Sequence, residues 1–306
     1  MIDKTFNILS LDGGGIRGIF PAHIIKCIEE RLSISVFDKF DMLAGTSTGS
    51  IIATGIAYGK SPAEIVDLYL NNGEKIFSCK VKSWWPTWVK QGVHSKYTND
   101  ELKKVLEAEF GDAVLGDIEK PLLIPSTDIG NGGVHVFKSG YSPQFTRDNS
   151  VLLKDAVLAS CSAPTFFDPA KVGSYLLADG GVWANNPTLA AVIEAKHRLG
   201  INVENIRVLS IGTGHSRTAY GTSHGKVWGL LNGWKGTGFI EFLLSLQAES
   251  IQNYTQLMLD KHQLMRVNFE TDIPLPLDDC SIMEDLISRA DKKFSYLSKD
   301  INEFLE

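Results

Sequence analysis

The 306-residue sequence has few cysteines, no excess of basic residues and no long apolar run. Its cysteines, Cys27, Cys79, Cys161 and Cys280, are widely spaced and form no Cys-x-x-Cys pair, which argues against a disulfide framework or a structural zinc site. The formal net charge of −6 disfavours nonspecific binding to nucleic-acid polymers, which need a basic surface. No stretch of about 18 apolar residues occurs, so we expect no membrane span.

The amino terminus lacks a basic region followed by a long apolar region, so the sequence predicts no secretory signal peptide. We therefore expect a cytoplasmic protein that contacts a membrane surface only peripherally. Hydrophobic residues make up 43% of the chain and charged residues 22%, as in ordinary globular proteins. Because no repeat or low-complexity segment is present, we treat residues 1–306 as a single domain.

The most informative stretch is DMLAGTSTGSIIATG at 41–55, which predicts the end of a strand, a tight turn and the start of a helix. GTSTG at 45–49 is a G-x-S-x-G elbow, a turn that lifts a serine clear of the sheet in strained backbone geometry. The two glycines prevent a clash between helix and strand, and the first amides of the helix point at an anion formed beside the hydroxyl. Ser47 is therefore a candidate nucleophile.

Two further strand ends carry glycine-rich turns. FNILSLDGGGIRG at 6–18 runs from an apolar strand into three glycines, whose N–H groups can crowd one point as an oxyanion or phosphate cradle. LLADGGVWANNP at 176–187 runs from a strand into an acidic turn that contains Asp179. Sites in α/β sheets are built at the carboxyl ends of strands. The three turns therefore offer an amide cradle, a serine and a carboxylate.

At this point the sequence resembles a known family. DGGGIRG at 12–18, GTSTG at 45–49 and DGG at 179–181 match the signature blocks of patatin-like acyl hydrolases in order, and ASCSAPTFFDP at 159–169 resembles the block before the third. The resemblance covers about the first 210 residues. It implies phospholipase A-type hydrolysis of acyl esters in membrane phospholipids. It also implies an α/β fold, a patatin-like three-layer α/β/α sandwich. The alternation of buried strands with helices likewise indicates a mostly parallel central sheet.

The resemblance also implies roles for individual residues: a Ser–Asp dyad without histidine, carried onto Ser47 and Asp179. Because the other histidines show no ligand spacing, we expect no metal, and we expect no cofactor. A carboxylate is a weak base, with an unperturbed pKa near 3.9, so we expect burial to raise the pKa of Asp179. Arg17 has two open roles, bracing the glycine loop or binding a substrate phosphate. The candidate oxyanion-hole donors are the amides of Gly13, Gly14, Gly15 and Thr48.

The character of the chain changes after Gly214. Residues 215–238 are rich in glycine and predict a loop or lid, followed by helices over 239–259 and 283–306. We interpret residues 6–214 as the catalytic part and residues 215–306 as a C-terminal lid or regulatory segment.

Family members of this kind in bacteria include phospholipase effectors that cyclic dinucleotides activate in anti-phage defence. The resemblance makes such an activator an expected partner, although no motif in the chain carries it. We expect it to bind residues 215–306 or the segment with Trp84, Trp85 and Trp88. These tryptophans lie among lysines, which suits a lipid headgroup boundary or a groove on this protein or a partner subunit. A homo-oligomer is a further expected arrangement, left open.

Two other functions fit parts of the sequence. Ser47, Asp179 and His215 occur in the chain order of an α/β-hydrolase triad, and His215 follows a strand end. Alternatively, the G-x-G-x-x-G pattern at 13–18 resembles a dinucleotide fingerprint, with Asp38 or Asp41 as the acidic partner. The dinucleotide hypothesis leaves the serine elbow and the acidic turn unexplained.

Overall fold

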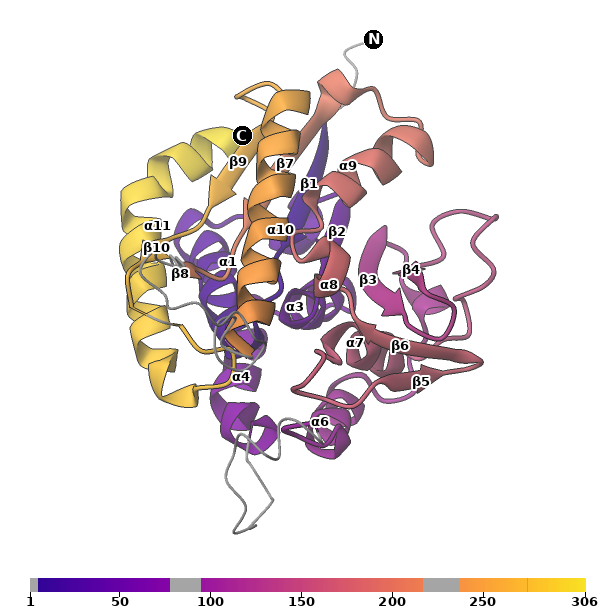
Figure 1. The fold of residues 1–306 in the computed structure, drawn as a ribbon. Coiled ribbons are helices and arrows are strands. Elements are labelled where there is room, and N and C mark those ends of the chain that lie inside the picture. Colours follow the sequence, from indigo (N-terminus) through magenta and orange to yellow (C-terminus); the bar gives the residue numbers. More distant parts are fainter. Residues whose placement is uncertain (1–4, 78–94, 217–236, 274) are drawn as a thin grey trace, which may run out of the picture.

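A computed structural model describes residues 5–77, 95–216, 237–273 and 275–306 of the protein (Figure 1). Its centre is an eight-stranded sheet in which β1 (Phe6–Leu11) lies between β2 (Met42–Gly45) and β7 (Ile206–Ile211). β3 (Leu122–Asp128) and β9 (Leu264–Val267) extend this parallel run on its two sides. The predicted, mostly parallel α/β sheet is therefore confirmed.

The remaining strands of this sheet pair antiparallel. They are β4 (Gly133–Lys138), which forms a hairpin with β3, and β6 (Tyr175–Asp179), which pairs with β3 and with β5 (Ala170–Val172). A separate two-stranded sheet joins β8 (His215–Ser216) to β10 (Glu270–Thr271).

Helices cover both faces of the sheet (Figure 1). Alternation along β1 shows the two layers, because Leu9 packs into the core beneath α1, whereas Ile8 packs with Ala191 and Val192 of α9. α10 lies beside α8 and α9. The helices are α1 (Ile19–Leu32), α2 (Val36–Lys39), α3 (Thr48–Ala57), α4 (Pro62–Ile76), α6 (Asp100–Phe110), α7 (Leu153–Cys161), α8 (Gly181–Ala184), α9 (Thr188–His197), α10 (Thr237–Met258) and α11 (Met283–Leu305). Within the described ranges, none of these helices combines the length and the apolar character needed to cross a bilayer.

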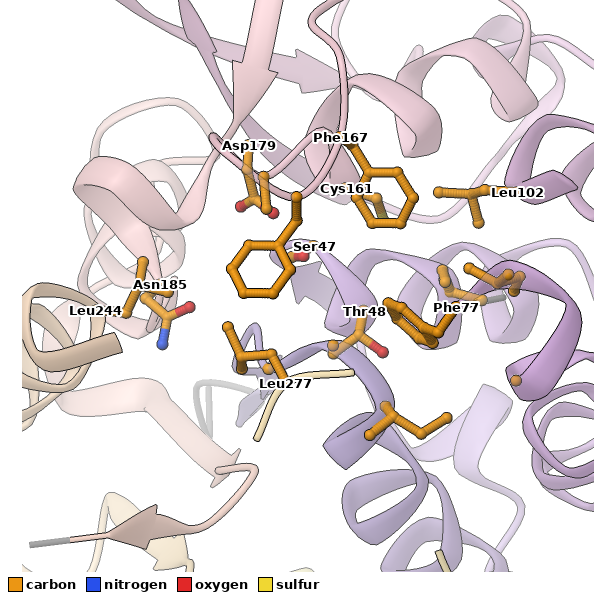
Figure 2. Close-up of a pocket in the computed structure, with 18 of the residues that line it drawn as sticks. Ser47, Thr48, Phe77, Leu102, Cys161, Phe167, Asp179, Asn185, Leu244 and Leu277 are labelled. Atoms are coloured by element: carbon orange, nitrogen blue, oxygen red, sulfur yellow. The ribbon is translucent and has the colours of Figure 1, made fainter. Parts of the chain in front are cut away.

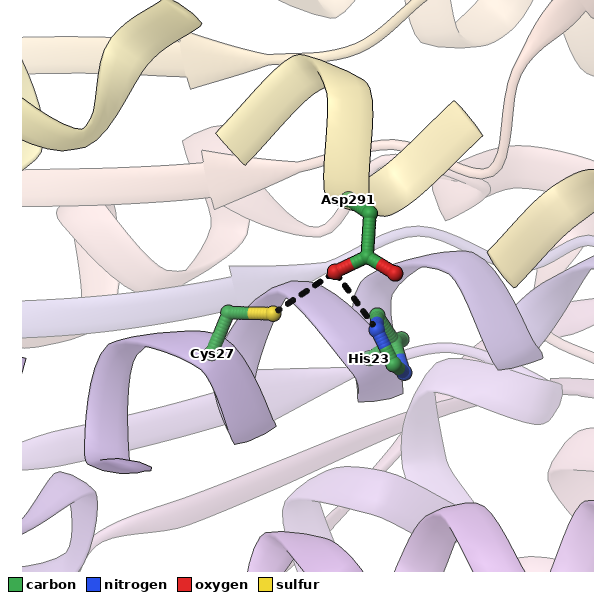
Figure 3. A group of neighbouring side chains, drawn as sticks. All are labelled: His23, Cys27 and Asp291. Carbon is green, nitrogen blue, oxygen red and sulfur yellow. Dashed lines mark hydrogen bonds and ion pairs between the residues drawn. The ribbon is translucent and has the colours of Figure 1, made fainter. Parts of the chain in front are cut away.

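The C-terminal segment is built into the fold, because β9 extends the central sheet and α11 packs along α1. At the contact of these helices, the carboxylate of Asp291 accepts from Cys27 Sγ at 3.7 Å and lies 3.3 Å from His23 Nε2 (Figure 3). The same carboxylate accepts from Arg31. Burial raises the pKa of Cys27 to about 11, so its thiol stays protonated, and Arg31 pairs with the same oxygen of Asp291. We therefore interpret these side chains as structural contacts that join α1 to α11.

Two predicted features lie outside the described residues. They are the tryptophan segment, which falls within 78–94, and most of the glycine-rich stretch, which falls within 217–236.

Candidate active site

The elbow around Ser47 has the predicted strained backbone. β2 ends at Gly45, Ser47 has φ +52° and ψ −124°, and α3 begins at the next residue. A Cβ at Gly45 would lie 2.1 Å from the carbonyl oxygen of Gly49, and one at Gly49 would lie 2.4 Å from that of Leu11. Only glycines therefore allow this approach of helix to strand.

Hydrogen bonds hold the elbow in this conformation. The N–H of Ser47 donates to Ser160 Oγ at 2.9 Å, and that hydroxyl donates to the carbonyl of Pro125 at 2.6 Å. The hydroxyl of Ser50 donates to the carbonyl of Ser47 at 2.6 Å. Ser160 belongs to α7 and to the 159–169 stretch, which gave a family match in the sequence but no indication of this contact. The strained backbone of Ser47 is thus fixed from both sides.

Asp179 reaches the elbow from a strand that runs antiparallel to its neighbour. Ala44 of β2 lies opposite Leu123 of β3, whereas Asp179 of β6 lies opposite Ser126. Counting along β3 places Asp179 level with the turn that follows β2. Ser47 and Asp179 lie on the wall of one cavity (Figure 2), where the serine hydroxyl is close enough to lower the pKa of the Asp179 carboxyl.

The Asp179 carboxyl is buried, with 5% of the residue exposed. Burial raises its pKa to about 6, and the hydrogen bonds from Ser47 and from the N–H of Gly181, at 2.6 Å, oppose this rise. A pKa near 6 suits a general base that works close to neutral pH, because the group is ionised and still accepts a proton readily.

The glycine loop has two different sides. Thr213 Oγ1 donates to the carbonyl of Gly13 at 2.9 Å, and Arg17 Nε donates to the carbonyl of Gly14 at 3.2 Å. In a trans peptide the C=O and N–H groups point in opposite directions. Anchoring these two carbonyls therefore aims the N–H groups of Gly14 and Gly15 the other way. Both glycines line the cavity that holds Ser47.

The candidate oxyanion donors are not equivalent. The N–H of Gly13 donates to the carbonyl of Asn185 at 2.9 Å and is therefore occupied, which corrects its inclusion in the predicted set. Among the described residues, the N–H groups of Gly14, Gly15 and Thr48 have no acceptor. The residues with open donors, in the loop and at the start of α3, thus line the same cavity as Ser47.

Arg17 lies behind the loop and is 8% exposed. Its bond to Gly14 is the bracing contact considered in the sequence analysis. It does not line the cavity of Ser47 but borders a second cavity. The structure therefore does not bring Arg17 to the place where substrate would meet Ser47.

The cavity at Ser47 is apolar and has a volume of about 80 Å³. Besides Ser47 and Asp179, residues of α4 and α6 contribute to its wall (Figure 2). Phe166, Phe167 and the α10 residues Ile240 and Leu244 also line it. Asn185, which sequence reasoning missed, closes the side next to the glycine loop.

The two alternative functions are not supported by this geometry. His215 borders the second cavity and, within the described part of the chain, forms no hydrogen bond with Ser47 or Asp179. Asp41 accepts from the N–H of Asn7 at 2.8 Å, at the amino end of β1 and β2. Because the glycine loop follows the carboxyl end of β1, Asp41 lies at the opposite end of the strands from it.

Comparisons with known proteins agree with the geometry. The family described as patatin-like phospholipase matches residues 9–192. A cGAMP-activated phospholipase of Vibrio cholerae is 34% identical over 69% of this chain and 65% of its own length. A cGAMP-activated phospholipase of Pseudomonas aeruginosa is 30% identical over 81% of this chain and 74% of its own. A cUMP-AMP-activated phospholipase of Escherichia coli is 32% identical over 69% and 66%. The match thus spans slightly less than two thirds of the first and third of these relatives.

Proposed function

The chain belongs to the patatin-like phospholipase family, and we propose that it hydrolyses acyl esters of membrane phospholipids through Ser47 and Asp179. The observation that carries the proposal is the position of the Ser47 hydroxyl beside the buried carboxylate of Asp179, whose pKa is about 6, at the wall of an apolar cavity. A serine hydroxyl becomes a useful nucleophile when a base of suitable pKa is in hydrogen-bond contact with it.

In the proposed reaction, Ser47 Oγ attacks the ester carbonyl carbon while Asp179 takes the hydroxyl proton. The tetrahedral oxyanion accepts hydrogen bonds from the N–H groups of Gly14, Gly15 and Thr48. Asp179 then protonates the leaving alcohol, and the lysophospholipid departs. In the second half, Asp179 takes a proton from water, which attacks the acyl-enzyme. Asp179 then returns this proton to Ser47 Oγ, and the fatty acid is released. Each oxyanion donor contributes roughly 10²–10³ in rate in comparable sites.

The size of the apolar cavity supports a regulated enzyme. Its volume of about 80 Å³ is smaller than an engineered cavity of about 150 Å³ that accommodates benzene. A long acyl chain therefore enters only after a wall moves. α10 is the candidate, because it carries Ile240 and Leu244 on this wall.

We further propose that a cyclic dinucleotide drives this opening, since the relatives that match are named for activation by cGAMP or cUMP-AMP. Peripheral membrane contact is supported by apolar side chains around the cavity. Val182 of α8 lines it and is 53% exposed, and Leu243 and Leu246 are exposed on the neighbouring α10. Such a patch suits docking on a lipid surface.

Fatty-acid release from phospholipid vesicles tests the proposal. We would compare the native chain with Ser47→Ala, Asp179→Asn and His215→Ala, each with and without cGAMP and cUMP-AMP. Release should fall more than about a thousandfold in the first two variants, as for other nucleophile and base deletions. It should persist in His215→Ala, which borders the second cavity and is therefore assayed with the nucleotides in excess. Loss in all three variants would favour the triad, and undiminished release from Ser47→Ala would contradict the proposal.

A further inference from the structure

A second cavity lies behind the glycine loop. We propose that it is the site where an anionic nucleotide, the activator of the enzyme, binds; this inference rests on the proposed function. Its volume of about 490 Å³ falls within the range of about 300–1,000 Å³ that is typical of small-molecule sites. It is also much larger than the acyl cavity. Six of its lining residues carry the argument: Arg17, Thr213, Leu244, Gln252, Arg266 and Lys293.

The charges at this cavity favour an anionic ligand. Arg266 pairs with Asp12 and contacts both oxygens of its carboxylate, so it is not available to a ligand. Arg17 is bonded to protein only through Nε among the described residues, so its two terminal nitrogens form a fork that suits a phosphate. Lys293 is half-buried and forms no ion pair within the described part of the chain.

Acidic side chains also lie at or near this cavity, and their burial decides how strongly they repel an anionic ligand. Glu249 and Glu270 line the cavity but are exposed to solvent, which weakens their repulsion of an anion. Glu241 acts on Arg17 more strongly than Asp12 does, and burial raises the pKa of Glu241. The carboxylate of Asp12 is already balanced by Arg266. Among the described residues, Arg17 and Lys293 are therefore the cations at this cavity that have no ion-pair partner.

Gln252 supplies a second kind of recognition. Its side-chain oxygen and nitrogen are both buried, and neither has a hydrogen-bond partner in the described structure. Leaving a buried amide unpaired is costly, so such a group calls for a polar partner. A nucleobase edge presents adjacent donors and acceptors, which an amide can bind through two hydrogen bonds. Phosphate and base together are the chemistry of a nucleotide.

The cavity is coupled to the active site through the glycine loop. Arg17 and Thr213 line this cavity and anchor the carbonyls of Gly14 and Gly13. The amides on the other side of the same peptides line the acyl cavity. A phosphate bound by Arg17 therefore acts on the side chain that holds the Gly14 carbonyl and so orients the N–H of Gly15.

α10 provides the second connection. Gln252 lies on this helix at the second cavity, Leu244 lines both cavities, and Ile240 lines the acyl cavity. Gln247, on the same helix, donates to the carbonyl of Trp183 at 2.8 Å and so ties α10 to the turn that follows Asp179. A ligand held by Gln252 can thus shift the helix that narrows the acyl cavity. Activation should then increase with acyl length, being small for a butyryl ester and large for a long-chain ester.

Binding measurements on the full chain test the site directly. We would measure the Kd of cGAMP and cUMP-AMP by calorimetry for the native chain, Lys293→Ala and Gln252→Leu. Matched controls are Lys292→Ala and Gln256→Leu, because these residues are exposed on the same helices and lie outside the cavity. Each cavity variant should weaken binding of the activating nucleotide about tenfold or more, and each control should leave the Kd unchanged.

Further arms separate the outcomes. Ser47→Ala should bind the nucleotide with native Kd. If the native chain binds the nucleotide in a way that depends on Lys293 but hydrolyses no phospholipid, the proposed function fails and the nucleotide site stands. Hydrolysis by a native chain that binds neither nucleotide, or equal Kd values in the cavity variants and controls, would overturn the inference. Glycerol 3-phosphate serves as a probe for a lipid headgroup. If it binds with the same dependence on Lys293 and the nucleotides do not, the cavity belongs to substrate and the inference is overturned.

Discussion

The guanidinium of Arg266 contacts both carboxylate oxygens of Asp12, and its Nη1 lies 2.9 Å from Oδ1. This pair joins β9, near the end of the chain, to the residue that precedes the glycine loop. Its side chains are 15% and 4% exposed. The C-terminal segment therefore contributes directly to the position of the loop that carries the candidate oxyanion donors.

Removing Arg266 should be strongly destabilising, because it leaves a buried carboxylate without a partner. Arg266→Met should lower the free energy of unfolding by about 3–5 kcal/mol, measured by denaturant titration. The double variant Asp12→Asn/Arg266→Met should recover much of this loss. Lys299→Met removes an exposed partner of Glu303 and should cost about 1 kcal/mol or less. A loss for Arg266→Met no larger than that of this control would contradict the role of the pair.

The pH dependence of catalysis should follow Asp179. Its carboxylate must be ionised to accept the proton of Ser47, and burial places its pKa at about 6. We therefore expect kcat/KM for a soluble ester to be level above about pH 7 and to fall about tenfold per unit well below pH 6. Activity that stays flat down to about pH 4, the range of an unperturbed aspartate, would show that this pKa does not control the reaction.

The same group should reduce stability at neutral pH. Its folded pKa of about 6 lies above the unfolded value near 3.9, so the folded state holds the proton more tightly. The cost of ionisation is thus absent below about pH 4 and complete above about pH 6. Asp179→Asn should raise the free energy of unfolding by about 1–3 kcal/mol near pH 8 and change it little near pH 4. A variant that is less stable than the native chain at both pH values would refute this.

Thr213 should act as a positioning residue for the glycine loop. Thr213→Val removes the hydroxyl that donates to Gly13 but keeps the shape of the side chain. We expect kcat to fall about tenfold or more with little change in KM, because the donors to the oxyanion lose alignment only in the transition state. Thr213→Ser retains the hydroxyl and should restore most of the rate. Equal loss in both variants would indicate packing rather than alignment.

Much of the fold and of the candidate site could be predicted because the signals are local. The Ser47 elbow, the glycine loop and the Asp179 turn each consist of a buried strand and a glycine pattern within about a dozen residues, and each fixes its own backbone. The patatin-like fold followed from their order and is confirmed. The expectation that burial raises the pKa of Asp179 also agrees with the structure.

The rest depends on partners that are distant in sequence. Ser160 meets Ser47, Thr213 meets Gly13 and Arg266 meets Asp12 across 113, 200 and 254 positions, and no local pattern marks such contacts. The sequence placed Asp179 at the end of a strand but did not indicate that this strand, β6, pairs antiparallel with β3 and β5. Gly13 was counted as an oxyanion donor because its amide looks equivalent to its neighbours until Asn185 is placed beside it. The homo-oligomer stays a prediction.

Covalent labelling of Ser47 tests the central claim most directly. The native chain would be treated with an alkyl fluorophosphonate, which traps activated serines, and analysed by intact mass and peptide mapping, with Ser47→Ala and Asp179→Asn in parallel. The account predicts one adduct, located on Ser47, that is absent from Ser47→Ala and forms far more slowly in Asp179→Asn. An adduct on another residue, or equal labelling of the native chain and Asp179→Asn, would contradict the Ser47–Asp179 dyad.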